Sequence, residues 1–118
     1  IDYSLATRTM AFDIKKLDWS KEIFEVAGID VNKMSKTVPT GTDAGAITAE
    51  AAEKTGLAPS THIVSISHDQ VSAAIGAGAF DSSVAVDGAG TVECVTPIYD
   101  SIPDIDAMYD GYFPLYHM

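Results

Sequence analysis

Apolar positions between residues 19 and 27 recur at the spacing of one face of a helix. Asp18 stands before this segment and can cap the helix, and Gly28 provides a natural C-terminal stop. The sequence therefore predicts a helix between these two residues. The predicted apolar face consists of Trp19, Ile23, Phe24, Val26 and Ala27.

Two more helices follow from the same kind of pattern. Residues 49–55 are good helix formers, with Thr48 as a cap and Gly56 as a stop. A third helix is predicted to begin at residues 68–70, and it is rich in alanine and glycine, which permits close packing against a neighbour. Its predicted apolar face consists of Val71, Ala74, Ile75 and Ala79.

Strand-like segments alternate with these helices. Residues 61–67 are apolar and β-branched, which is typical of a strand buried on both faces. A shorter strand is predicted around residues 46–47, after the polar loop 31–45. Residues 84–86 and 91–96 indicate the two strands of a hairpin. The alternation predicts the α/β fold class.

Composition narrows the functional classes. The chain has 118 residues, the size of one small domain, and its 47% apolar content excludes a disordered tail. Seven basic against seventeen acidic residues give a net charge of −10, so we expect no nucleic-acid partner and no anionic-lipid surface. A single cysteine cannot form an internal disulfide, and no apolar run is long enough to span a membrane. We therefore expect a cytoplasmic protein.

The two ends of the chain suggest a part of a larger protein. Ile1 opens the sequence without an initiator methionine, and residues 109–118 hold four aromatic side chains with no helical or strand period. Such a segment needs a surface to pack against, which a further part of the protein could provide. The alternative is that it folds back on its own core.

The first candidate for chemistry is the junction 65–70, where the predicted buried strand runs into the third helix. An aspartate here, Asp69, would project into the crevice where open α/β sheets bind ligands. Free backbone N–H groups at a helix start would stabilise its anion, which could accept a proton from a hydroxyl within hydrogen-bonding reach. The alternative is that Asp69 is only the N-cap of the helix.

The second candidate is the turn formed by Gly88, Gly90 and Thr91. Backbone N–H groups and a hydroxyl in a tight hairpin can approach phosphate oxygens. An ordinary glycine-containing hairpin turn explains the same residues. The pattern also lacks the Lys-Ser/Thr ending of a P-loop and the third glycine of a dinucleotide fingerprint.

Other polar residues carry weaker signals. His68 could orient Asp69 or contact a substrate, or it could be a structural histidine, whereas His62 and His117 belong to no constellation. Cys94 has no basic partner nearby in the sequence, so we expect a small core residue rather than a nucleophile. Trp19 is likewise predicted to be an anchor of the core. Four acidic residues lack the spacing of a calcium loop and indicate a solvated segment: Asp100, Asp104, Asp106 and Asp110.

The order of motifs resembles the FGGY family of carbohydrate kinases. The similarity covers roughly residues 2–98, and the combination is specific although each piece alone is not. The motifs are SLATRTMAFDI (4–14), LDW (17–19), GID (28–30), VPTG (38–41), AAEKTGL (51–57), HDQ (68–70), AGA (77–79) and GTVE (90–93).

This resemblance implies roles for individual residues. Asp69 stands at the position of the family's catalytic base, which takes the proton of the substrate hydroxyl as that oxygen attacks the γ-phosphoryl group. Its neighbours His68 and Gln70 are expected to bind substrate. Gly90 and Thr91 resemble the family's second phosphate-contacting loop and are expected to bind the nucleotide.

The resemblance also implies an actin-like, ribonuclease-H-like fold with two domains that close over ATP and a sugar or polyol. Residues 1–80 would form the last part of the first domain and residues 81–118 the start of the second, with the joint near residues 80–83. The family's first phosphate loop, an Asp-x-Gly-Thr hairpin that helps to hold Mg²⁺, is not among these residues. Val92 and His68 depart from the residues that many relatives carry.

Two functional hypotheses remain open at this point. The first is an ATP-dependent carbohydrate kinase of which this chain is a fragment, inactive alone. The second is a kinase-derived binding or assembly module without chemistry. A hydrolase that uses Asp69 would need a partner carboxylate, and none stands at a convincing position. Under the first hypothesis, exposed strands and apolar surface predict a homo-oligomer of the isolated chain.

Overall fold

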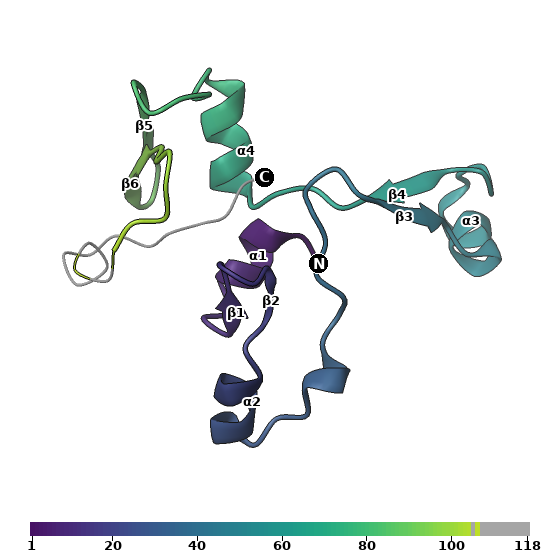
Figure 1. The fold of residues 1–118 in the computed structure, drawn as a ribbon. Helices are drawn as coiled ribbons and strands as arrows, with labels where there is room; N and C mark the ends of the chain where they lie inside the picture. Colours follow the sequence, from purple (N-terminus) through teal and green to yellow (C-terminus); the bar gives the residue numbers. More distant parts are fainter. Residues whose placement is uncertain (105, 107–118) are drawn as a thin grey trace.

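The computed structural model describes residues 1–104 and residue 106. Its helices and strands follow one another as the sequence predicts for mixed α/β content. Instead of one continuous sheet, the described strands form three separate antiparallel pairs (Figure 1). The aromatic segment 109–118, with Asp110 and His117, lies outside the described residues. The elements are α1 (Tyr3–Thr7), β1 (Phe12–Asp13), β2 (Asp18–Trp19), α2 (Lys21–Ala27), the 3-10 helix η1 (Val31–Lys33), β3 (Asp43–Ala46), α3 (Ala49–Thr55), β4 (His62–Val64), α4 (Asp69–Gly76), β5 (Ala85–Ala89) and β6 (Glu93–Pro97).

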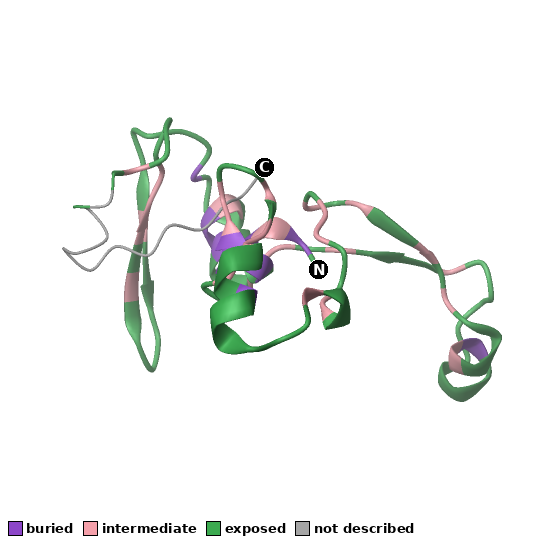
Figure 2. Ribbon diagram, turned by 60° about the horizontal axis from the view of Figure 1, so that its bottom comes forward, coloured by how far each residue is buried: buried purple, intermediate pink, exposed green. Residues whose placement is uncertain are grey.

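The chain has an open shape. Its Cα radius of gyration is 16.9 Å, and its principal extents are 49, 39 and 27 Å. A compact domain of this length would have a radius of gyration of roughly 13–14 Å. Buried residues gather in the middle of the molecule, around α1 and the start of α4, whereas the β3–β4 and β5–β6 pairs are mostly exposed (Figure 2).

Aromatic packing joins α1 to the β1–β2 pair. Phe12 of β1 lies opposite Trp19 of β2. Neighbouring ring centroids along the row Tyr3, Phe12, Trp19 and Phe24 are 5.5 to 6.1 Å apart, within the range of favourable aromatic contacts. The Trp19 indole also donates to the carbonyl of Ser35 at 2.9 Å. Trp19 therefore anchors this cluster, although its own surface is only half-buried.

The first predicted helix begins later than its apolar pattern indicates. Ser20 is the N-cap of α2, so the predicted capping role of Asp18 is wrong. Asp18 and Trp19 form β2 instead, because Trp19 packs edge-on against the aromatic rings on both sides of it. Gly28 does end the helix, at a φ of 67° that glycine adopts without strain.

The apolar face predicted for this helix is only partly buried. Phe24 is buried among the aromatic rings, whereas Ile23 and Val26 are exposed, the latter by 87%. Ile23 and Val26 are exposed because no other described element covers that side of α2. Helical spacing alone therefore identified the helix without identifying its buried side.

The second predicted helix, α3, has the predicted ends. The Thr48 hydroxyl accepts the backbone N–H of Ala51 at 3.1 Å, and Gly56 closes the helix at a φ of 73°. Both capping predictions are confirmed. A salt bridge of 2.6 Å between Lys54 and Glu50 spans one turn on its exposed surface.

The strand predicted over residues 61–67 is shorter and more exposed than expected. Only three of its residues form β4, which pairs with β3 alone among the described strands. All three are exposed, so the prediction of a strand buried on both faces is wrong. Ile63 and Val64 are each about half exposed because no described layer covers the pair.

The third predicted helix and the hairpin are both present. In α4, Val71 and Ala74 are buried as predicted, and Ala79 is buried just beyond the helix end. β5 and β6 pair in register up to Ala89 opposite Glu93, which leaves a loop of residues 90–92. The turn therefore lies two residues later than predicted, because Gly88 is still paired, with Cys94.

Candidate active site

Asp69 is the first residue of α4, and its side chain is 90% exposed. Its carboxylate accepts the backbone N–H of Gln70 at 2.8 Å. The N-cap of the helix is His68, so the reading of Asp69 as that N-cap is wrong. An exposed carboxylate with one local hydrogen bond keeps acceptor capacity for an incoming hydroxyl.

His68 is mostly buried, with 18% of its side chain exposed. Its Nδ1 accepts the backbone N–H of Gln70 at 3.3 Å, and it also lies 3.1 Å from the nearer carboxylate oxygen of Asp69. The first contact requires Nδ1 without a proton, and the second becomes an ion pair only when the ring is protonated. Nδ1 of His68 can therefore cap the helix when it carries no proton, or pair with the Asp69 carboxylate when it carries one, but it cannot do both at once.

A hydrogen-bond network that is buried at Ser4 and Asp2 is joined to this junction. The backbone N–H of His68 donates to the hydroxyl of Ser4 at 2.7 Å, across 64 positions of sequence. The Ser4 hydroxyl donates in turn to a carboxylate oxygen of Asp2 at 2.8 Å. Thr40 donates its hydroxyl to the same oxygen at 2.8 Å.

Asp2 has no exposed surface, and both of its carboxylate oxygens accept hydrogen bonds. Burial raises the pKa of Asp2, but hydrogen bonds from the side chains of Ser4 and Thr40 and from the backbone of Ser4 and Leu5 outweigh burial, so the pKa lies below its ordinary value. The group is therefore an anion near neutral pH. The sequence pattern did not single out Asp2. The only local feature that could have indicated its role is an aspartate placed two positions before a serine at the start of a helix.

Gln70 links this junction to the β5–β6 hairpin. The Cys94 thiol lies 3.6 Å from the side-chain oxygen of Gln70, a weak hydrogen bond between β6 and the first turn of α4. Thr91 stands three residues before Cys94, so about 10 Å of chain separates them at the rise of a strand. The fold thus brings the two segments that the sequence singled out into one region. Cys94 is half-buried rather than a core residue.

The tip of the hairpin is exposed at both Gly90 and Thr91. A Cβ at Gly90 would make an ordinary contact of 3.8 Å with the carbonyl of Val92. Neither Gly90 nor Gly88 has a positive φ. The hairpin itself therefore does not require glycine at these positions, and glycine inside or beside a strand often marks close approach by a ligand.

The described part of the chain contains no candidate metal-binding cluster. No group of three or more His, Cys, Asp or Glu side chains lies close enough together there to hold an ion. Of the acidic segment near the C-terminus, Asp100 accepts a hydrogen bond from Ser82 at 2.5 Å. The residues that the structure describes therefore do not fit a Mg²⁺ site by themselves.

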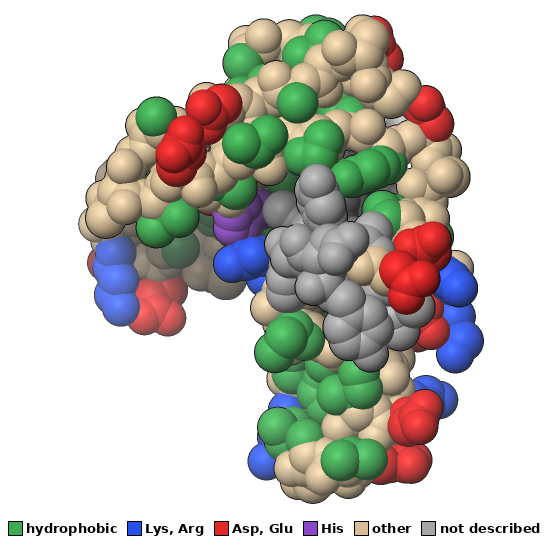
Figure 3. Space-filling model, turned by 90° about the vertical axis from the view of Figure 1, so that its left-hand side faces the viewer, with side chains coloured by type: hydrophobic (Ala, Val, Ile, Leu, Met, Phe, Trp, Pro, Cys, Tyr) green, Lys and Arg blue, Asp and Glu red, His purple; other side chains and the backbone are tan. Residues whose placement is uncertain are grey.

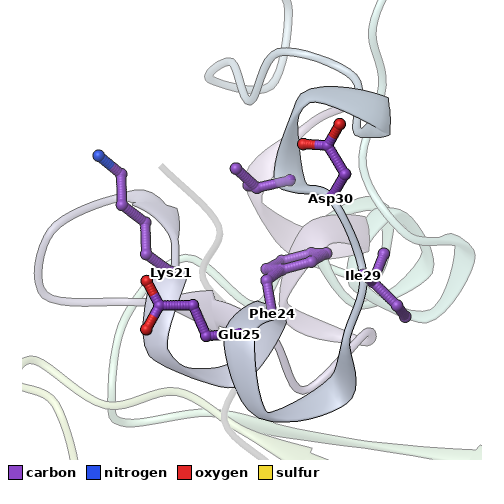
Figure 4. A pocket seen from close by; sticks show the side chains of 6 residues that line it. Lys21, Phe24, Glu25, Ile29 and Asp30 are labelled. Carbon is purple, nitrogen blue, oxygen red and sulfur yellow. The ribbon is translucent and has the colours of Figure 1, made fainter.

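A shallow hollow lies beside α2 (Figure 4). Its volume is about 220 Å³, below the usual range of roughly 300–1,000 Å³ for ligand pockets. The Phe24 ring lies in its centre, and none of the junction or hairpin residues described above lines it. We assign no function to this hollow. Its lining consists of Lys21, Phe24, Glu25, Ile29, Asp30 and Val31.

The sequence of this chain matches the model of one known protein family. The family model described as "FGGY family of carbohydrate kinases, N-terminal domain" matches residues 1–76, more than half of the chain. The chain belongs to the FGGY family of carbohydrate kinases. The matched FGGY region includes Asp2, Ser4, Thr40 and the whole junction up to the end of α4.

Similar FGGY proteins include kinases of three names. The gluconokinase of Bacillus subtilis is 34% identical over 100 residues, which cover 85% of this chain and 20% of that protein. The xylulose kinase of Lactococcus lactis is 28% identical over 103 residues, covering 87% and 21%. The glycerol kinase of Thermococcus onnurineus is 34% identical over 83 residues, covering 52% and 17%. The chain thus spans about one fifth of the length of these relatives.

Among the residues that the structure describes, no helix has the length and apolar character to cross a bilayer.

Proposed function

We propose that the chain is part of a kinase that transfers the γ-phosphoryl group of ATP to a hydroxyl of a sugar or polyol. Its relatives are named gluconokinase, xylulose kinase and glycerol kinase. Gluconate, xylulose and glycerol all carry hydroxyl groups, so a hydroxyl as the acceptor of the phosphoryl group is consistent with all three names. The observation that carries the proposal is the exposed carboxylate of Asp69 on a junction held by the hydrogen bond from the His68 N–H to Ser4. When bound, ATP supplies the phosphoryl group.

Asp69 acts as the general base in this proposal. Its carboxylate accepts the proton of the substrate hydroxyl while that oxygen forms its bond to phosphorus and the bond to the ADP oxygen breaks. The base also orients the attacking oxygen, and positioning contributes a large part of the rate enhancement in phosphoryl transfer. Its 90% exposure supports this role, because a substrate can reach the carboxylate from solvent.

His68 and Gln70 bind the substrate beside the base. The Gln70 side-chain oxygen is engaged by Cys94, which leaves its NH₂ group to donate to a substrate hydroxyl. Nδ1 of His68 is engaged at the helix start, so Nε2 is the ring nitrogen available to a ligand. Both contacts would select for hydroxyl-rich molecules.

Gly90 and Thr91 contact the phosphate groups of the nucleotide. The exposed hydroxyl of Thr91 can donate to a phosphate oxygen, and the absence of a side chain at Gly90 lets backbone approach the ligand closely. The described residues offer no Mg²⁺ site, so we assign no step to the metal on this part of the chain.

The domain division follows the same proposal. Residues 1–80 form the end of the first domain of an actin-like, ribonuclease-H-like fold, and residues 81–118 begin the second. The match to the family's N-terminal domain ends at residue 76, where α4 also ends, which supports a joint near residues 80–83. We further propose that residues 1–118 alone are inactive, because a base without a nucleotide pocket and a metal site cannot carry out the transfer.

The test is Asp69→Asn in the full-length protein, assayed against a panel of sugars, sugar acids and polyols with ATP and Mg²⁺. We expect kcat to fall by about 100-fold or more, since general-base catalysis contributes roughly 10²–10⁴-fold. Substrate affinity should change little, because asparagine keeps the shape of the side chain. Residues 1–118 alone should give no turnover above background.

The matched control is Asp18→Asn. Asp18 is also exposed and also accepts the N–H of the following residue at 2.8 Å, so both variants remove one exposed negative charge next to the same kind of local hydrogen bond. The control should retain wild-type kcat. Retained activity in Asp69→Asn would overturn the assigned role. A wild-type protein that binds sugars but transfers no phosphate would favour a binding module.

A further inference from the structure

We propose that Asp2, Ser4 and Thr40 form a positioning unit for Asp69, acting through the backbone N–H of His68. This inference rests on the proposed kinase function and adds to it residues that do not touch the substrate. It assigns a purpose to the most deeply buried polar group of the described chain.

The unit closes a ring of contacts around the junction. On one side the loop residues Gly41 and Thr42 pair with Ser65 through two backbone hydrogen bonds of 2.7 and 2.9 Å. On the other side the N–H of His68 donates to Ser4 at 2.7 Å. The segment 65–68, which leads into the base, is therefore held at both of its ends.

Asp2 connects the two sides of this ring. One of its carboxylate oxygens accepts the hydroxyls of Ser4 and Thr40, each at 2.8 Å. Thr40 belongs to the loop that pairs with Ser65, and Ser4 holds His68. Because Ser4 donates its hydroxyl proton to Asp2, its lone pairs are directed toward the His68 N–H. The anion thus sets the direction of the bond that fixes the junction.

The network exceeds what capping of α1 requires. Capping uses the N–H groups of Ser4 and Leu5, at 3.0 and 3.2 Å from the Asp2 carboxylate. The bonds to Thr40 and, through Ser4, to His68 reach 38 and 64 positions along the chain. Asp2 has no exposed surface and cannot contact a substrate, so its effect on catalysis passes through the backbone.

The test uses variants of the full-length protein that distinguish the effect of the Thr40 hydroxyl from the effect of the shape of its side chain. Thr40→Val removes the hydroxyl and keeps the shape, whereas Thr40→Ser keeps the hydroxyl. Ser4→Ala removes the acceptor of the His68 N–H. Thr37→Val is the matched control, because Thr37 is half-buried like Thr40 and its hydroxyl donates at 3.4 Å to the carbonyl of Leu17, outside the network.

We expect Thr40→Val and Ser4→Ala each to lower kcat by about tenfold with little change in KM for ATP, since misplacing the reacting groups by about 1 Å can cost roughly 100-fold in rate. Thr40→Ser and Thr37→Val should keep wild-type kcat. Hydrogen exchange of the His68 amide should become faster in Ser4→Ala. If Ser4→Ala does not fold, the two Thr40 variants decide alone.

Three outcomes would speak against the inference. Folded Thr40→Val with wild-type kcat overturns it. So does a Thr40→Ser variant as impaired as Thr40→Val, because packing of the methyl group would then be the cause. A wild-type protein inactive on every substrate of the panel refutes the kinase function itself, and is recognised before any variant is made.

Discussion

At the residue scale, two aspartates have opposite surroundings. Asp2 is fully buried and accepts hydrogen bonds from four donors, whereas the Asp69 side chain is 90% exposed and accepts one backbone N–H. A buried carboxylate that accepts several hydrogen bonds from the protein holds structure in place. A carboxylate with open acceptors is free to take a proton from a ligand.

The lowered pKa of Asp2 predicts a contribution to stability that depends on pH. A carboxyl group whose pKa is lower in the folded state stabilises the fold above its unfolded value, here 3.8, and this stabilisation is lost as the pH falls through the folded-state pKa. Asp2→Asn should therefore lower the free energy of unfolding by about 2 kcal/mol at neutral pH. The difference from wild type should shrink below pH 3.8.

Urea unfolding of both proteins between pH 2 and 7 measures this difference. Asp18→Asn serves again as control, because the exposed carboxylate of Asp18 accepts the N–H of the next residue and takes no part in the Asp2 network, so its curve should follow wild type. A difference between Asp2→Asn and wild type that stays constant down to pH 2 would show that the charge of Asp2 does not stabilise the fold.

At the scale of elements, α3 depends mainly on its own residues. It lies at the outer end of the β3–β4 pair (Figure 1), and Ala52 is its one buried residue. Its stability therefore rests on the Thr48 cap, the Glu50–Lys54 pair and the Gly56 stop. An isolated helix of seven residues is marginal in water, so the loss of one such interaction should be visible locally.

Thr48→Ala should destabilise α3 by about 1 kcal/mol, the usual cost of losing a Thr N-cap. Amide exchange of residues 51–55 should become roughly fivefold faster, whereas exchange at α4 should not change. Thr48→Ser keeps the capping oxygen and should behave as wild type. Equal exchange in Thr48→Ala and wild type would show that contacts to other elements hold the helix.

Exposed edges and apolar surface dominate the whole molecule. Each described sheet has two strands, so every one of those strands has an open edge. Hydrophobic side chains also lie among the surface atoms in Figure 3. Such surfaces favour association with other protein surfaces. Exposed residues of this kind include Ile23, Val26, Ile63, Val64, Val92 and Val95.

We predict that residues 1–118 in isolation form dimers or larger oligomers through these surfaces. Because the net charge of −10 opposes close approach, association should strengthen with salt. Sedimentation at rising protein and salt concentration measures it. Ile63→Lys should weaken association by charging an open strand, whereas Ser60→Lys, an exposed turn position with the same change of charge, should not. A clean monomer at high concentration would contradict the prediction.

Local chemistry explains which parts of the fold were predictable. The ends of α3 and the Gly28 stop follow from side chains next to the helices they terminate. The start of α2 did not, because packing of Trp19 drew Asp18 into a strand. The burial of residues 61–67 was also predicted wrongly, since exposure depends on which layers cover a strand rather than on its own composition.

The candidate site shows the same division. By its own pattern the sequence determined that Asp69 opens a helix, that a glycine-containing hairpin follows, and that the motifs are those of the FGGY family. Only the tertiary structure decided that Ser4 holds the backbone of His68 and that Cys94 lies against Gln70. Caps and turns depend on neighbours within a few positions, whereas these contacts join residues 64 and 24 positions apart, and no local pattern records such a partner.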